Sequence, residues 1–87
     1  MITEQSRRQR ADEIMTQAVR EIHAVFPQFQ IDVFDTGPER EDGLIIVHVP
    51  EPGMFDDMWD IVGKLLTDAM LNEDLHIALG TERYEVA

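Results

Sequence analysis

The sequence contains no cysteine, one lysine (Lys64), one serine (Ser6) and one tryptophan (Trp59). Without cysteine the chain can form neither a disulfide framework nor a thiolate zinc site, and it has no thiol nucleophile. Ser6 lies close to the N-terminus, and Lys64 stands among acidic residues with which it forms ordinary surface pairs on a helix. We therefore expect a protein that packing alone stabilises and that is not an enzyme.

Long apolar runs are also missing. No stretch approaches the roughly 18 consecutive apolar residues that a membrane span needs, and residues 1–10 carry three arginines and no apolar run. We therefore expect a cytoplasmic protein without a membrane segment. With 87 residues, 44% of them hydrophobic and 29% charged, the chain can bury one core and not two. The sequence predicts a single domain over residues 1–87.

Positive charge is scarce as well. The chain carries 18 acidic residues against seven lysines and arginines, a net charge of −11. Residues 1–27 are balanced, with four arginines and four acids, so the whole excess lies in residues 28–87. Such a surface repels phosphate backbones, and we expect no nucleic-acid partner, with Arg7, Arg8 and Arg10 as a small exception. The acidity suits a basic protein partner, or it serves solubility or salt tolerance alone.

Two segments have the spacing of amphipathic helices, with apolar residues three and four positions apart. In the first, the apolar positions run from Ala11 to Phe26. Thr3 or Ser6 suits the N-cap of this helix, and Pro27 ends it, because proline disfavours a helical residue before it. The second begins at Met54 and continues to Met70, after Pro50 and Pro52 have stopped the preceding segment. Its apolar arc is about 180° wide, which exceeds what packing on one sheet face requires.

Two further segments predict a β-hairpin. Apolar and polar residues alternate over residues 28–33, the pattern of a half-buried strand. Residues 44–49 are almost wholly apolar, as expected of an interior strand. Between them, residues 35–43 are rich in turn-forming and charged residues, so we expect a long acidic loop.

Alternation from Leu75 to Leu79 predicts a third strand, and Gly80–Thr81 suits a tight turn into a fourth strand over residues 82–86. The strands around the second helix should be parallel, with a right-handed crossover. The fold class is therefore α+β, a two-layer sandwich of order α-β-β-α-β, with one further strand as an alternative. We expect a mixed sheet of three or four strands, with two helices on one face.

One group of side chains suggests chemistry. If the alternating apolar residues face the helices, then Asp32, His48 and His76 face the opposite side of the sheet. Two imidazoles and a carboxylate can bind a transition metal, so a metal or small-ligand site on the open sheet face is one hypothesis. The alternative is that both histidines are structural. No phosphate-binding, zinc-protease or calcium-binding motif is present, and we expect no cofactor.

Apolar residues in excess of one core suggest an interface. Three would lie on the uncovered sheet face and three on the second helix: Phe34, Leu44, Ile46, Phe55, Trp59 and Met70. The helix residues also suit a core, because methionine fills irregular gaps. Large exposed apolar patches are rare on monomers. We therefore expect a non-enzymatic protein-interaction or regulatory module, a homodimer or a partner of another, possibly basic, protein.

Overall fold

The structure, a computed structural model, describes residues 4–50 and 53–83. Its elements follow in the order α1 (Glu4–Val25), β1 (Gln30–Phe34), β2 (Gly43–Val49), α2 (Phe55–Glu73) and β3 (Ile77–Arg83). The predicted α+β class and the order α-β-β-α-β are confirmed. Neither of these helices is long and apolar enough to cross a membrane.

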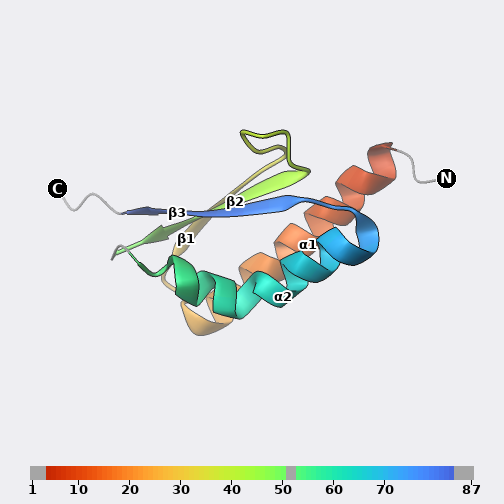
Figure 1. The fold of residues 1–87 in the computed structure, drawn as a ribbon. Coiled ribbons are helices and arrows are strands. Elements are labelled where there is room, and N and C mark those ends of the chain that lie inside the picture. The colour runs from red at the N-terminus through yellow and green to blue at the C-terminus, as the bar shows by residue number, and fades with distance from the viewer. Residues whose placement is uncertain (1–3, 51–52, 84–87) are drawn as a thin grey trace.

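The three strands form one mixed sheet with β2 at its centre. β1 pairs with β2 antiparallel, and Asp32 lies opposite Ile46. β3 pairs with β2 parallel, and Ile46 lies opposite Gly80. In Figure 1, α1 and α2 run beside each other along the same side of this sheet. The hairpin of β1 and β2, its long loop and the parallel arrangement of β2 and β3 are therefore as the sequence predicts.

The core lies between β2 and the two helices. Along β2, Ile45, Val47 and Val49 are buried and the residues between them are only half-buried. The helices supply the other side of this cluster, chiefly through Ile22 of α1 and Met58 of α2, which are also fully buried. Burial of aliphatic side chains at this density is the main source of stability in a domain without disulfides or metals.

A glycine stands where β2 begins and α1 comes close. A Cβ atom on Gly43 would lie 2.6 Å from Sδ of Met15 in α1. The absence of a side chain at Gly43 thus lets the helix approach the end of the central strand.

The apolar spacing starts at Ala11, whereas α1 itself starts at Glu4, in agreement with the expected start near Thr3 or Ser6. The added turns are held by ion pairs rather than by apolar contacts. Arg7 donates from Nη2 to both carboxylate oxygens of Asp42 at 3.1 Å and to the main-chain oxygen of Asp74 at 2.8 Å. Arg10 donates from Nε to Glu73 at 2.6 Å. Periodicity of apolar residues does not report such contacts, which explains the difference.

The third strand also differs from its prediction. β3 begins at Ile77, because Asp74 ends α2 in the left-handed conformation and Leu75 is buried in the connection. It then continues through Gly80 and Thr81, so the predicted turn there is wrong. Continued pairing with β2 as far as Val49 keeps these two residues extended. The described residues form three strands, and residues 84–86 of the proposed fourth strand lie outside them.

The core predicts a clear contrast between two apolar residues of the hairpin. Ile45→Ala should lower the free energy of unfolding by about 2–5 kcal/mol, because it leaves a cavity among packed side chains. Val33→Ala, at a position 50% exposed, should change it by less than about 1 kcal/mol. Urea denaturation of both variants measures the difference. Equal effects would contradict the assignment of Ile45 to the core.

The Arg10–Glu73 pair predicts a pH-dependent contribution to stability. Hydrogen bonds from Arg10 lower the pKa of Glu73. The folded state thus binds this proton less readily than the unfolded state, whose glutamate has a pKa of about 4.3. The contribution is complete above that value and is lost as the pH falls through the folded pKa. Glu73→Gln should therefore be less stable than wild type at neutral pH.

The measurement is urea denaturation of both proteins from neutral to acidic pH, and the difference should vanish at the acidic end. Arg10→Gln serves as the matched variant, because it removes the same hydrogen bonds. A difference that stays constant over the whole range would contradict this role of the pair.

Candidate functional site

The side of the sheet that faces away from the buried residues of β2 is called the outer sheet face here. Its members alternate with Ile45 and Val47 along β2 and lie opposite one another in the strand register. They are Gln30, Asp32, Phe34, Leu44, Ile46, His48, Ala78, Gly80 and Glu82. The face divides into an apolar end, with the row Phe34, Leu44 and Ala78, and a polar end, with the row Gln30, His48 and Glu82, while the middle row combines Asp32 with Ile46 and Gly80.

The apolar end contains Phe34, Leu44 and Ile46. Phe34 is 49% exposed, and Leu44 and Ile46 are half-buried. Ile46 lies over Gly80 of the neighbouring strand, where a Cβ atom would come within 3.0 Å of its Cδ1. Ala78 lies opposite Leu44. Small residues on β3 thus leave the larger side chains of β2 and β1 standing out from the sheet.

The polar end is organised around His48. Its Nε2 donates a hydrogen bond to Oδ2 of Asp32 at 2.7 Å, and its Nδ1 lies 3.8 Å from Oε2 of Glu82. The imidazole side chain is 19% exposed, so it is the most enclosed of the three. The imidazole of His48 therefore lies between two carboxylates, one within hydrogen-bond distance and one farther away.

His76 does not join this group, so the predicted convergence of Asp32, His48 and His76 is wrong. The structure brings Asp32 and His48 together. The parallel register places Ile77 opposite Gly43 and Glu82 opposite His48, so His76 lies at the far end of the sheet. There its imidazole lies 3.4 Å from Asp74. Alternation predicted the face of each residue but contains no information on the register, which decided the outcome.

Glu82 takes the place expected for His76, and the sequence indicated no role for it. It was expected in a fourth strand, whereas β3 continues far enough to place it beside His48. Within residues 4–50 and 53–83, no group of three or more histidine, aspartate or glutamate side chains is arranged to hold a metal ion.

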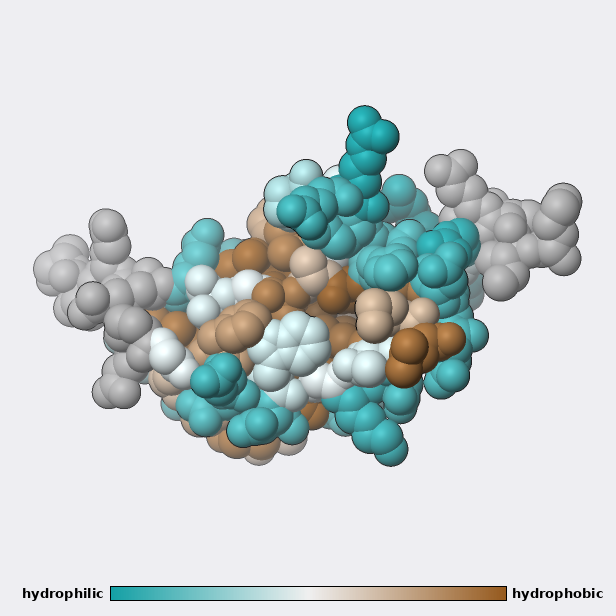
Figure 2. Space-filling view, viewed as in Figure 1, coloured by the Kyte–Doolittle hydropathy of each residue, from teal (hydrophilic) through white to brown (hydrophobic). Residues whose placement is uncertain are grey.

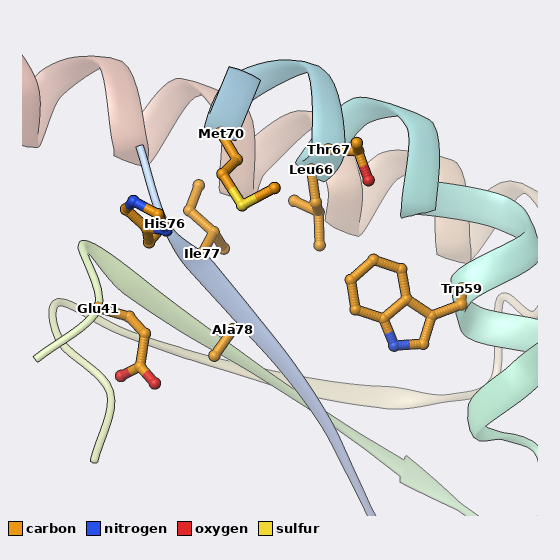
Figure 3. A pocket seen from close by; sticks show the side chains of 8 residues that line it. All are labelled: Glu41, Trp59, Leu66, Thr67, Met70, His76, Ile77 and Ala78. Carbon is orange, nitrogen blue, oxygen red and sulfur yellow. The ribbon is translucent and has the colours of Figure 1, made fainter. Parts of the chain in front are cut away.

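A second surface lies between α2 and β3, and we name it the α2–β3 groove. It contains a hollow of about 200 Å³. The lining residues come from α2, from β3 with the residue before it, and from the hairpin loop: Glu41, Trp59, Leu66, Thr67, Met70, His76, Ile77 and Ala78. Figure 3 shows Trp59 at one end of the hollow and Glu41 with His76 at the other. Ala78 belongs both to the groove and to the outer sheet face.

Two neighbours on α2 fix the indole ring of Trp59. Phe55, one turn earlier, meets it edge to face with ring centroids 6.0 Å apart. Gly63, one turn later, leaves room for the ring, because a Cβ atom there would lie 3.0 Å from Cε3 of the indole. The ring therefore lies along the helix and is only half-buried.

The six predicted interface residues thus fall on two surfaces. Phe34, Leu44 and Ile46 lie on the outer sheet face, whereas Phe55, Trp59 and Met70 lie on α2 at or beside the groove. Apolar residues also remain exposed on α2, including Met70 at 41%. The wide apolar arc of this helix therefore exceeds what the core covers, in line with the expectation from its sequence.

The arginines near the N-terminus are occupied within the molecule. Arg7 binds Asp42, Arg8 lies 3.2 Å from Asp35, and Arg10 binds Glu73 and Glu13. Each guanidinium is therefore neutralised by at least one carboxylate. This pairing removes the basic patch that the first ten residues suggested.

Comparison with known proteins adds no functional information, since no protein-family model, no curated protein and no solved structure matches the chain significantly. The site must therefore be interpreted from its own geometry.

The position of His76 leads to a prediction about zinc. With His76 at the far end of the sheet, only Asp32 and His48 of the predicted zinc ligands lie together. Structural zinc sites use four ligands, so we expect equimolar zinc to change the melting temperature of the protein by less than about 2 °C. Thermal denaturation with and without zinc measures this. A larger rise that disappears in His48→Ala and persists in His76→Ala would instead show that Asp32, His48 and Glu82 bind the ion.

Proposed function

We propose that this protein is a non-enzymatic protein-interaction module that forms a homodimer through its outer sheet face. The observation that carries the proposal is the exposed apolar end of that face, Phe34 with Leu44 and Ile46. The two helices do not cover it, because α1 and α2 lie on the other side of the sheet (Figure 1).

Charge favours a second copy at this place. Two chains of net charge −11 repel each other over most of their surfaces. Of the nine strand positions on the outer sheet face, only Asp32 and Glu82 are acidic, and both lie beside His48. The remaining acids lie elsewhere, many of them on α2 and in the hairpin loop. Contact through these nine positions therefore brings few carboxylates of the two molecules together.

The packing that results is familiar in sheet proteins. Two sheets stack face to face about 10 Å apart, with side chains from both interdigitating. Here Phe34 would fill the space above the small residue Ala78 of the partner molecule. An interface of this kind is isologous, because both copies contribute the same surface.

Sedimentation velocity tests this function. Wild type should sediment as a dimer at protein concentrations of about 0.1 mM, and Ile46→Glu should sediment as a monomer, because it buries a charge at the centre of the interface. Phe34→Glu, at a more exposed position, should also give a monomer. Circular dichroism of both variants should match that of wild type.

The matched control is Leu71→Glu, which introduces the same charge at a position on α2 that is 71% exposed. It should remain dimeric. A monomeric wild type, or a dimer that survives both Ile46→Glu and Phe34→Glu, would contradict the proposal.

A further inference from the structure

The outer edge of β3 is an unpaired strand edge. Within the described chain β3 pairs only with β2, so the main-chain groups along its other edge have no strand partner. Its first five residues, Ile77 to Thr81, include no charged residue and no proline. Natural proteins usually protect a strand edge with charged residues or proline, or cover it with a helix or loop, because an open edge accepts a further strand. β1, the other edge strand, has Asp32 at its centre.

The α2–β3 groove lies directly beside this edge. Side chains of an added strand point alternately to the two faces of the sheet, and those on the helix side would face the hollow of about 200 Å³. Trp59, Met70 and Ile77 make its lining largely apolar (Figure 3). The hollow is therefore suited to one large apolar side chain of an extended segment.

The surroundings of the groove are acidic. α2, which forms one wall, carries five acidic residues and one lysine. Helical spacing places Asp56, one turn before Trp59, on the same side of α2. Glu41 lines the opposite end of the hollow, and no lysine or arginine is among its lining residues. In Figure 2 hydrophilic residues border a band of apolar and near-neutral residues that crosses this face.

We propose that the edge of β3 binds an extended segment of another protein in which apolar residues alternate with lysine or arginine. The segment adds to the sheet as a strand, and one of its apolar side chains enters the hollow beside Trp59. Its cations lie near Asp56 and Glu41. Such strand addition derives affinity from main-chain hydrogen bonds and specificity from a pocket for alternate side chains.

A second copy of this chain is a poorer occupant of the same edge. Pairing β3 with β3 would bring two acidic α2 helices toward each other, and like charges across an interface weaken association. The proposal rests on the binding role proposed above, but it uses a different surface. Stacking through the outer sheet face leaves the edge of β3 accessible, so both contacts can exist in one assembly.

Fluorescence of Trp59 provides a direct readout, because it is the only tryptophan of the chain and lines the hollow. The probe is a short peptide of alternating lysine and valine with one central phenylalanine and no tryptophan. Titration into wild type should change the emission of Trp59 to saturation. A peptide with glutamate in place of each lysine should bind at least about 10-fold more weakly. Binding of the basic peptide should also weaken as salt rises from about 0.05 to about 0.5 M.

Main-chain pairing is tested by a third peptide, identical to the first except for N-methylation of alternate residues. It keeps the charges and the apolar side chains but cannot donate hydrogen bonds along one edge. It should bind at least about 10-fold more weakly, since the ladder of hydrogen bonds is lost. Equal affinity of the methylated peptide would overturn strand addition.

Two variants with the same change of charge locate the site. Met70→Lys places a cation in the lining of the hollow and should weaken binding of the basic peptide about 10-fold or more. Leu71→Lys, on the adjacent and more exposed position outside the lining, should change it less than about 3-fold, through long-range charge alone. Equal effects of the two variants, or no binding of the basic peptide to wild type, would overturn the proposal.

The dimer and the groove are separated by crossing the variants. Ile46→Glu should abolish the dimer and leave the affinity for the basic peptide unchanged. Met70→Lys should leave the dimer intact and weaken binding of the basic peptide. A groove that fails to bind while the dimer forms overturns only this inference. A monomer that binds the peptide overturns only the proposed homodimer.

Discussion

The rest of the structure depends on the central strand β2, which pairs with a neighbour along each of its edges and buries every second side chain. Antiparallel pairing to β1 and parallel pairing to β3 fix which residues share a row. Burial of Ile45 and Val47 fixes which face meets the helices. Because both helices lie on that face, neither helix covers the apolar residues of the opposite face, and within residues 4–50 and 53–83 no strand pairs with the outer edge of β3.

Charge is distributed in a way that agrees with these two surfaces. Arg7, Arg8 and Arg10 of α1 bind carboxylates of the hairpin loop and of α2, so these three arginines are used for internal contacts. Glu41 lies in the lining of the α2–β3 groove and further acids lie on α2, while most of the outer sheet face is uncharged. The same chain can therefore present one surface that tolerates a second copy and another that favours a basic partner.

Much of the fold was predictable because local signals agreed with the final packing. Alternation along the hairpin correctly placed Ile45 inside and Ile46 outside, and the helix–strand order indicated the parallel pairing of β2 and β3. Two of the three residues of the expected polar group, Asp32 and His48, are in contact. The expected place of His76 beside His48 was wrong, and the place of Glu82 beside His48 was not predicted. Both follow from the register between β2 and β3, which depends on where α2 ends and how Leu75 is buried.

The sequence by itself determined the class of the fold, the face to which each strand residue points and the excess of acid and of apolar surface. These properties follow from periodicity and composition, which are local. Tertiary structure alone decided the strand register, the ion pairs of Arg7 and Arg10 at the start of α1, the continuation of β3 through Gly80 and the hollow beside Trp59. Each of these depends on contacts between residues far apart in the chain, whose partners no local pattern specifies.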